Sequence, residues 1–263
     1  MDENSIAFFH RSGDWLVGND AARGPWSEDA CHAGPVSGIL AGAAEALVPE
    51  KQLVRLSANF FRPIPISGFR CDSDLIRSGR TTSIAKVELV DRNARVCASA
   101  NCLFLATELN EFPTAAIPHP SFDTSITGRF PLEETRHGKP MFGDFIDIRY
   151  PPGEDGDPGP TTLWMRVPSI VSGEESSKFQ SLCPLADCGN GISRNAEFTN
   201  ISCLNPDLTV AIFRLPESDW IASQAISFWE HTGIGMSHAM LFDNSGPIGT
   251  ALQSLVLRTA KQS

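Results

Sequence analysis

The stretch FRPIPISGFRCDSDLIRSGRTTSIAKVELVDRNARVCASANCLFL, residues 61–105, aligns without a gap on FRLPESDWIASQAISFWEHTGIGMSHAMLFDNSGPIGTALQSLVL, residues 213–257. The offset is constant at 213 − 61 = 152. Six aligned pairs are identical: Phe61/Phe213, Arg62/Arg214, Leu89/Leu241, Asp91/Asp243, Leu103/Leu255 and Leu105/Leu257. In both copies a polar turn follows the shared aspartate and separates two runs of alternating apolar residues, which is typical of a β-hairpin. A repeat of this period predicts a chain of two similar halves.

The overall composition is that of a globular protein that can bury a core. Of the 263 residues, 41% are hydrophobic and 20% are charged, which excludes a disordered chain. The net charge is 21 − 31 = −10 and no basic run occurs, so neither nucleic acid nor an anionic membrane surface is an expected partner. The acidic start, residues 1–4, does not predict a signal peptide, and no apolar run approaches the ~18 residues of a membrane span. We expect no membrane insertion and a cytoplasmic location.

Apolar periodicity predicts the same order of elements in each half. Residues 29–47 carry one apolar stripe at helical spacing, and the rest of this segment is mostly Gly and Ala, so a sheet could wrap closely around the helix. A second helical stretch passes through Phe179, Leu182, Leu185 and Asp187, where Pro184 must start or kink the helix. The predicted strands cover residues 8–17, 54–61, 69–76, 82–90 and 96–106 in the first half, and 145–150, 163–167, 208–214, 220–227, 235–242 and 248–259 in the second.

Proline marks the boundary between the halves. Five prolines without apolar periodicity fall in residues 108–140, which indicates a linker. We therefore divide the chain into an N-terminal domain of residues 1–106, a linker of residues 107–140 and a C-terminal domain of residues 141–263. The seven cysteines form no Cys-x-x-Cys pair and are interpreted as reduced, mostly buried residues, so no metal site is expected.

Six short motifs occur in order along this repeat: HAGP at 32–35, FRPIP at 61–65, SGRT at 78–81, LADCGNG at 185–191, NPDLTV at 205–210 and ALQSL at 251–255. With them the chain resembles the TesB-like (type II) acyl-CoA thioesterases over nearly its whole length. The resemblance implies an α+β fold, a tandem or double hotdog in which two long helices are wrapped by a continuous antiparallel sheet. Hotdog sheets expose edge strands, so we also expect a homo-oligomer, a dimer or larger.

The resemblance also implies an activity, the hydrolysis of acyl-CoA by an activated water without a cofactor. In the family that water is held by an aspartate on the helix, a hydroxyl or amide residue at the start of the next strand and a glutamine on the last strand. Matched position by position, these are Asp187, Asn205 and Gln253. Some family members carry threonine at the place of Asn205, and asparagine offers no hydroxyl, so the rate could differ.

The residues themselves support this assignment. Asp187 follows an apolar stretch that should place it beside the core, where a carboxylate is costly unless it has partners or a task. Gln253 is the one large polar residue of an apolar strand. The structural alternative is that Asp187 caps the end of the helix and that Gln253 lies at the rim. At the repeat positions of Asp187 and Gln253 the first half carries Pro35 and Asn101, so we expect one active site per chain, in the second half.

Other candidates are weighed in the same way. His32 is expected to hydrogen-bond near the start of the first helix rather than to catalyse. Ser237 lies in a sequence that approximates a nucleophile elbow, but the repeat places it inside a strand, which disfavours a serine hydrolase. Hotdog hydratases use an aspartate followed five residues later by a histidine, and this chain has no such pair.

Arginine is the expected partner of the coenzyme A phosphates, because guanidinium binds phosphate in a bidentate fork. The candidates are Arg194, Arg62 and Arg214, with Arg80 and Arg166 as further possibilities. The sequence therefore predicts an acyl-CoA thioesterase. The alternatives are a non-catalytic acyl-CoA-binding protein and a hotdog enzyme that acts on another small apolar substrate.

Overall fold

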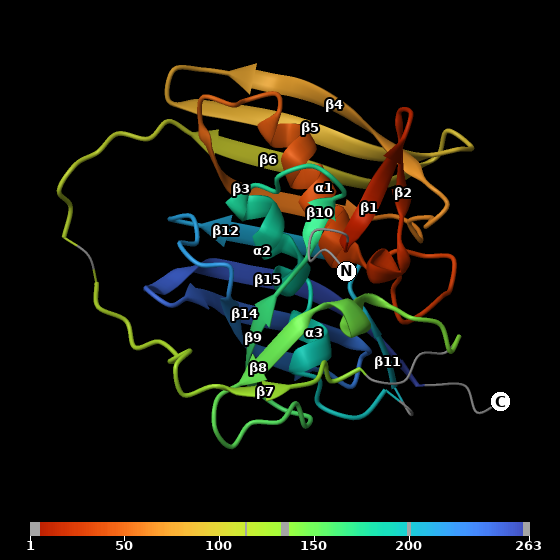
Figure 1. The fold of residues 1–263 in the computed structure, drawn as a ribbon, viewed down its shortest axis with the longest axis vertical. Helices are drawn as coiled ribbons and strands as arrows, with labels where there is room; N and C mark the ends of the chain where they lie inside the picture. Colours follow the sequence, from red (N-terminus) through yellow and green to blue (C-terminus); the bar gives the residue numbers. More distant parts are fainter. Residues whose placement is uncertain (1–5, 114, 133–136, 199–200, 260–263) are drawn as a thin grey trace.

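Strands dominate the computed structural model of the chain, which describes residues 6–113, 115–132, 137–198 and 201–259 (Figure 1). The acidic start and parts of the predicted linker, residues 114 and 133–136, lie outside the described residues. The first half contains β1 (Ala7–Ser12), β2 (Trp15–Gly18), η2 (Asp20–Ala22), α1 (Ala33–Glu45), β3 (Gln52–Phe60), β4 (Phe69–Ser78), β5 (Thr82–Asp91) and β6 (Val96–Leu105). The rest contains β7 (Ile126–Gly128), η3 (Phe142–Phe145), β8 (Asp147–Tyr150), β9 (Thr161–Arg166), β10 (Ser169–Val171), α2 (Lys178–Ala186), α3 (Gly189–Ile192), β11 (Ile201–Leu204), β12 (Asp207–Ile212), β13 (Ile221–Trp229), β14 (Ile234–Asp243) and β15 (Gly246–Thr259).

These strands form one continuous 15-stranded sheet. Its order is β10-β1-β2-β4-β5-β6-β3-β12-β15-β14-β13-β9-β8-β7, with β11 paired to β15. The pairs are antiparallel except for β1 with β10. The order β4-β5-β6-β3 is therefore followed by its mirror, β12-β15-β14-β13, so the two copies of the sequence repeat lie on either side of the middle of the sheet.

The two copies meet at a pair of equivalent residues. Strands β3 and β12 are antiparallel neighbours in which Ser57 stands opposite Thr209, and 209 − 57 = 152 is the repeat offset. The Thr209 hydroxyl donates to the Ser57 hydroxyl at 3.3 Å. The midpoint of this pair is therefore the point about which the two halves of the sheet are related.

The gap-free alignment of the repeat is wrong beyond the hairpin turn. Leu89 pairs with Ala98, nine residues on, whereas its counterpart Leu241 pairs with Gly249, eight residues on, so the first turn holds one extra residue. A shift of one residue moves every side chain of a strand to the other face. Ser237 consequently pairs with Gln253, while the equivalent residue Ala85 pairs with Cys102 and not with Asn101.

Only one of the two predicted long helices is long. Helix α1 has 13 residues, and its apolar residues are buried against the sheet. Helix α2 has nine residues and holds Pro184 inside it, so this proline neither starts the helix nor stands outside it. The helix ends at Ala186, and Asp187 is its C-cap. The following helix α3 has only four residues. The interruption places Asp187 at the end of α2, where it is buried.

The amino-terminal half of α1 lies directly against α2 (Figure 1). The contact depends on glycine. A Cβ at Gly34 would lie 2.8 Å from the carbonyl oxygen of Pro184 and 2.9 Å from its Cα, and a Cβ at Gly38 would lie 3.1 Å from the carbonyl oxygen of Gln180. The first turn of one helix and the last turn of the other can therefore meet only because these positions lack side chains.

Two smaller features differ from the sequence expectations. Residues 8–17 form not one strand but the hairpin of β1 and β2. Strand β7 falls within the predicted linker and pairs with β8, while the residues before it run far out from the sheet (Figure 1). In the described part of the chain, no helix is long and apolar enough to cross a membrane.

We expect Gly34→Ala to lower the free energy of unfolding by about 1–3 kcal/mol, because its Cβ would push against the backbone of α2. At an exposed helical position the same change would raise the free energy of unfolding by roughly 1 kcal/mol. The sign of the measured change therefore shows whether Gly34 is in close contact with α2. Gly38→Ala is the graded comparison, since its nearest contact is the flexible end of Ile170 at 2.9 Å. Urea titration measures both, and a Gly34→Ala protein as stable as the parent would contradict the close contact.

Candidate active site

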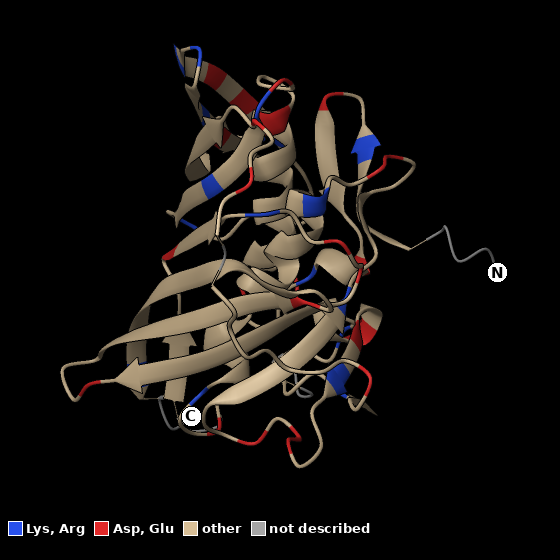
Figure 2. Ribbon diagram, turned by 90° about the vertical axis from the view of Figure 1, so that its left-hand side faces the viewer, with Lys and Arg blue, Asp and Glu red and all other residues tan. Residues whose placement is uncertain are grey.

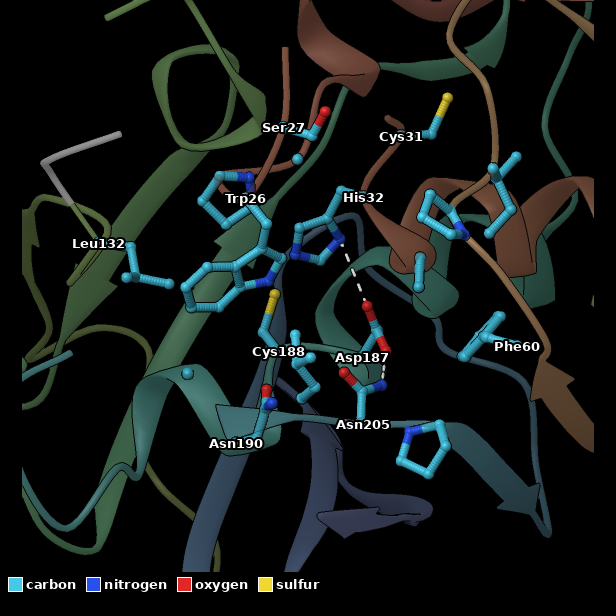
Figure 3. A pocket seen from close by; sticks show the side chains of 18 of the residues that line it. Trp26, Ser27, Cys31, His32, Phe60, Leu132, Asp187, Cys188, Asn190 and Asn205 are labelled. Carbon is cyan, nitrogen blue, oxygen red and sulfur yellow. Dashed lines mark hydrogen bonds and ion pairs between the residues drawn. The ribbon is translucent and has the colours of Figure 1, made fainter. Parts of the chain in front are cut away.

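Asp187 lies at the junction of the two halves. It is the C-cap of α2, and it is only 4% exposed. Its carboxylate faces the first turn of α1, and Figure 3 shows it pointing into a cavity between His32 and Asn205. The predicted burial of this residue beside the core is therefore observed.

Asn205 and Gln253, the other two predicted site residues, both contact this carboxylate. Asn205 Nδ2 donates to Asp187 Oδ1 at 2.7 Å, and Gln253 Nε2 donates to the same oxygen at 3.1 Å. Gln253 Nε2 also donates to the main-chain oxygen of Asp187 at 2.8 Å, while its Oε1 accepts from the N–H of Asn190 at 3.0 Å. The orientation of the Gln253 amide is therefore fixed, and Oδ1 of Asp187 is the oxygen that both amides bind.

Burial controls the protonation of Asp187. Desolvation raises its pKa to about 7, against the opposing effect of the hydrogen bonds from Asn205 and Gln253 and of the nearby Gly34 N–H, which itself donates to His32 Nδ1. A carboxylate with a pKa near 7 is both available as a base at neutral pH and basic enough to accept a proton from water. This combination is typical of a catalytic carboxylate and not of an exposed helix cap.

His32 stands beside Asp187, which the sequence did not predict. It is the N-cap of α1, and its Nδ1 accepts a hydrogen bond from the N–H of Gly34 at 3.1 Å, as expected for a structural histidine. The same Nδ1 lies 3.4 Å from Asp187 Oδ2. The imidazole stacks on Phe142 with ring centroids 4.3 Å apart, and burial lowers the pKa of His32 to about 4. Since 155 residues separate His32 and Asp187, no local pattern could have joined them.

A mostly apolar cavity of about 570 Å³ opens over the carboxylate (Figure 3). Both halves and the segment between them contribute to its wall. Trp26 comes from the loop before α1, Phe130 and Leu132 from the predicted linker, and Phe198 from the loop after α3. The rings of Trp26 and Phe198 meet edge to face at 5.6 Å. An apolar cavity of this size with a few polar groups in its lining is suited to an apolar ligand.

The three arginines predicted to bind phosphate are not together. Arg214 forms two hydrogen bonds with the buried carboxylate of Asp243, at 2.7 and 2.6 Å, and Arg194 is 4% exposed and binds Glu197 and the carbonyl oxygen of Gly156. Arg62 is exposed and lines the cavity. Of the three, Arg62 is the guanidinium that a ligand in this cavity could reach.

The remaining candidates occupy structural positions. Ser237 lies inside β14, is 1% exposed and is paired with Gln253, so it does not form a nucleophile elbow. The seven cysteines are all unpaired, and Cys188, which lines the cavity, has its pKa raised by burial. Within the described ranges no group of three His, Cys, Asp or Glu side chains could hold a metal ion.

The first half lacks a matching set of side chains. Counted from the N-caps His32 and Ser177, the residue of α1 that matches Asp187 is Gly42, and not Pro35 as the constant offset suggested. A Cβ there would lie 2.3 Å from the amide nitrogen of Gln180, so the Gln180 side chain fills this space. On the sheet, Cys102 pairs with Ala85 as Gln253 pairs with the equivalent residue Ser237, so the first half has a thiol where the second half has an amide.

Comparisons with known proteins give the same assignment for both halves. A family model for the acyl-CoA thioesterase C-terminal domain matches residues 118–257, and one for the N-terminal domain matches residues 22–105. No curated protein sequence matches the chain significantly.

Solved structures support the fold. One from Novosphingobium aromaticivorans, provisionally named a thioesterase, has 22% identity and a TM-score of 0.76, with 97% of this chain and 100% of that chain covered. A protein from Alicyclobacillus acidocaldarius, described as having a hot dog fold, has 15% identity, a TM-score of 0.71 and 96% coverage of both chains. An acyl-CoA thioesterase II from Mycobacterium marinum has 16% identity, a TM-score of 0.64 and coverage of 95% and 94%.

We expect Gln253→Ala to lower the turnover number by about 10-fold or more, because the Asp187 carboxylate loses one of its two amide donors. Two first-half residues, each changed to alanine, serve as controls. Asn101 is the counterpart of Gln253 by the constant sequence offset of the repeat, and Cys102 is its counterpart by strand pairing in the sheet. Asn101 lies exposed on the other face of the sheet, so its loss should leave turnover unchanged. Steady-state kinetics on the three variants make the comparison, and equal losses would show that both halves catalyse.

Proposed function

Because the chain belongs to the acyl-CoA thioesterase family it hydrolyses acyl-CoA thioesters, and we propose that Asp187, Asn205 and Gln253 form its single catalytic site. The observation that carries the proposal is the buried Asp187 carboxylate, which lines the apolar cavity and accepts both side-chain amide donors on Oδ1. The other oxygen, Oδ2, is thereby directed to the side of the cavity. It is the atom that would take a proton from water.

The reaction is R-CO-S-CoA plus water giving a carboxylic acid and free CoA. Asp187 accepts a proton from water as the water oxygen bonds to the carbonyl carbon, and it returns that proton to the sulfur when the carbon–sulfur bond breaks. Asn205 uses its Nδ2 on Asp187, which leaves its side-chain oxygen to accept a hydrogen bond from the same water. The sequence suggested that Gln253 also holds the water, but both its polar atoms are bound to the protein, so we assign it the positioning of Asp187.

The developing negative charge on the carbonyl oxygen requires a hydrogen-bond donor. The first N–H groups of a helix have no partner within the helix. Ala33 is the first residue of α1 and lines the cavity next to His32. We propose the backbone N–H of Ala33 as a donor to this oxygen.

Hydrolysis and mere binding are separated by one assay. Purified protein is incubated with acyl-CoAs of increasing chain length, and free thiol is measured against time. We expect thiol release that saturates with substrate for at least one chain length. Tight binding of acyl-CoA with no thiol release would favour the non-catalytic alternative.

Asp187→Asn removes the capacity to accept a proton but keeps the size of the side chain, so the rate should fall by ~10²- to 10⁴-fold. For the parent, kcat/KM should rise with pH through about 7, because only ionised Asp187 is active. A variant that is as fast as the parent would make Asp187 a structural cap.

The same substitution has a defined effect on stability. The pKa of Asp187 is raised in the folded protein, so its ionised form costs stability, and that cost is absent below the unfolded pKa and complete above about 7. Asp187→Asn should therefore raise the Tm more at pH 8 than at pH 5. Calorimetry at the two pH values measures this difference.

Arg62 is proposed to bind a phosphate group of coenzyme A. Arg62→Ala should lower kcat/KM for acyl-CoA by about tenfold or more, the effect of losing one charge-assisted hydrogen bond. It should leave acyl-pantetheine, which carries no phosphate, unaffected. Arg55→Ala is the matched control, because Arg55 is an exposed arginine of β3 outside the cavity lining. An equal loss with both substrates would remove Arg62 from phosphate binding.

The architecture and assembly of the chain complete the proposal. We read residues 1–106 and 141–263 as two hotdog domains in tandem, supported by the mirrored strand order. A homo-oligomer is supported by exposed apolar side chains on β13–β15, where Phe228 and Met236 are cross-strand partners that are 51% and 40% exposed. In the lower part of Figure 2 the long strands are mostly uncharged, and the charged residues there lie mainly in turns. Light scattering at micromolar concentration should give the mass of a dimer or of a larger assembly. The cytoplasmic location stays a prediction.

A further inference from the structure

His32 is held in one orientation on two sides. Its Nδ1 accepts the hydrogen bond of the Gly34 N–H at 3.1 Å, and its ring lies flat on Phe142, 4.3 Å between centroids and 14° from parallel. Phe142 in turn stacks on Phe8 and meets Phe130 edge to face. An imidazole fixed in this way presents its other nitrogen, Nε2, in a constant direction.

The hydrogen bond from Gly34 determines which nitrogen carries the proton. Nδ1 uses its lone pair as an acceptor, so in the neutral ring the proton is on Nε2. The ring is neutral at working pH, because burial lowers the pKa of His32 to about 4. Nδ1 therefore has no proton to give to Asp187 Oδ2, 3.4 Å away, and His32 is not a second base.

The Nε2–H group faces the cavity. Figure 3 shows one ring nitrogen of His32 turned to Asp187 and the other turned away from it, into the space between Trp26 and Cys188. Within the described part of the chain no side chain or carbonyl oxygen accepts a hydrogen bond from Nε2. Nε2 is not one of the buried polar atoms that lack a partner in the described residues, and His32 lines the cavity, so the oxygen of a bound ligand can accept a hydrogen bond from Nε2.

We propose that His32 Nε2–H donates a hydrogen bond to the carbonyl oxygen of the bound thioester. The inference rests on the proposed function and adds a side-chain donor to it. As the water oxygen bonds to the carbonyl carbon and Asp187 takes the water proton, the π electron pair moves onto the carbonyl oxygen. His32 stabilises that charge without transferring its proton. The pair returns as the carbon–sulfur bond breaks, and the sulfur leaves with the proton from Asp187.

The two ring nitrogens of His32 thus face different parts of the site. Nδ1 and the Asp187 carboxylate lie on one side of the imidazole, where the water is activated, and Nε2 lies on the side where the carbonyl oxygen would be placed. A neutral donor suits this position, because a cation beside Asp187 would stabilise its ionised form and lower its basicity. The burial that raises the pKa of Asp187 also keeps His32 uncharged.

Two substitutions separate this catalytic role from helix capping. Serine is a preferred N-cap, so His32→Ser keeps an acceptor for the Gly34 N–H but offers no donor to the cavity. His32→Gln places an amide N–H near the position of Nε2 but is a poor cap. We expect His32→Ser to lower kcat by ~10²- to 10³-fold with KM little changed, the loss typical of one oxyanion donor, and His32→Gln to retain most of kcat. If His32 only caps α1, the order is reversed, with Ser near the parent and Gln impaired, and the proposal is overturned.

A spectroscopic measurement tests the hydrogen bond itself. A 2-oxoalkyl-CoA, in which a methylene separates the sulfur from the carbonyl, cannot be hydrolysed but offers the same oxygen. Its infrared carbonyl stretch should lie at lower frequency when bound to the parent than when bound to His32→Ser. Equal frequencies would overturn the proposal. Failure of the parent to release thiol from any acyl-CoA would instead refute the proposed function, and the infrared comparison would still report on His32.

Discussion

The contact between the first turn of α1 and the last turn of α2 is the constraint on which the rest of the site depends. It exists because Gly34 presents no side chain to the backbone of Pro184. The contact shuts Asp187 away from solvent, which raises its pKa to about 7, and brings His32 of the first half to 3.4 Å from it. The proposed catalytic site therefore draws on both halves because of one helix packing interaction.

The same burial has opposite consequences for the two titratable groups. Desolvation disfavours charge, so it raises the pKa of the carboxyl group and lowers that of the imidazole. The result is a carboxylate that can accept a proton near neutral pH beside a histidine that stays neutral. Groups with such divergent pKa values suit separate roles, which supports the proposal of Asp187 as a base and His32 as a donor of hydrogen bonds.

The two halves share a sequence repeat and one sheet, but they differ in the turn of the hairpin and in the end of the helix. The extra residue in the turn after Asp91 brings Cys102 to the inner face where the second half has Gln253. Helix α1 continues through the position at which α2 ends, so the first half has no exposed helix end for a carboxylate. In its place the side chain of Gln180 packs against Gly42. The first half therefore supplies His32 and one wall of the cavity.

The sequence by itself determined the two halves, the hairpins and the first helix, and the resemblance to a known family nominated Asp187, Asn205 and Gln253 as candidate site residues. These features depend on local periodicity and on motifs that keep their order along the chain, and they can be read without knowing how the elements pack. Only the tertiary structure decided that α2 ends at Ala186, that one extra residue in the turn of the first hairpin shifts its register relative to the second, and that Arg194 and Arg214 bind carboxylates of the protein. The contact of His32 with Asp187 was also visible only in the tertiary structure. The two residues are 155 positions apart, and they meet because two helices pack together, which no pattern within either helix predicts.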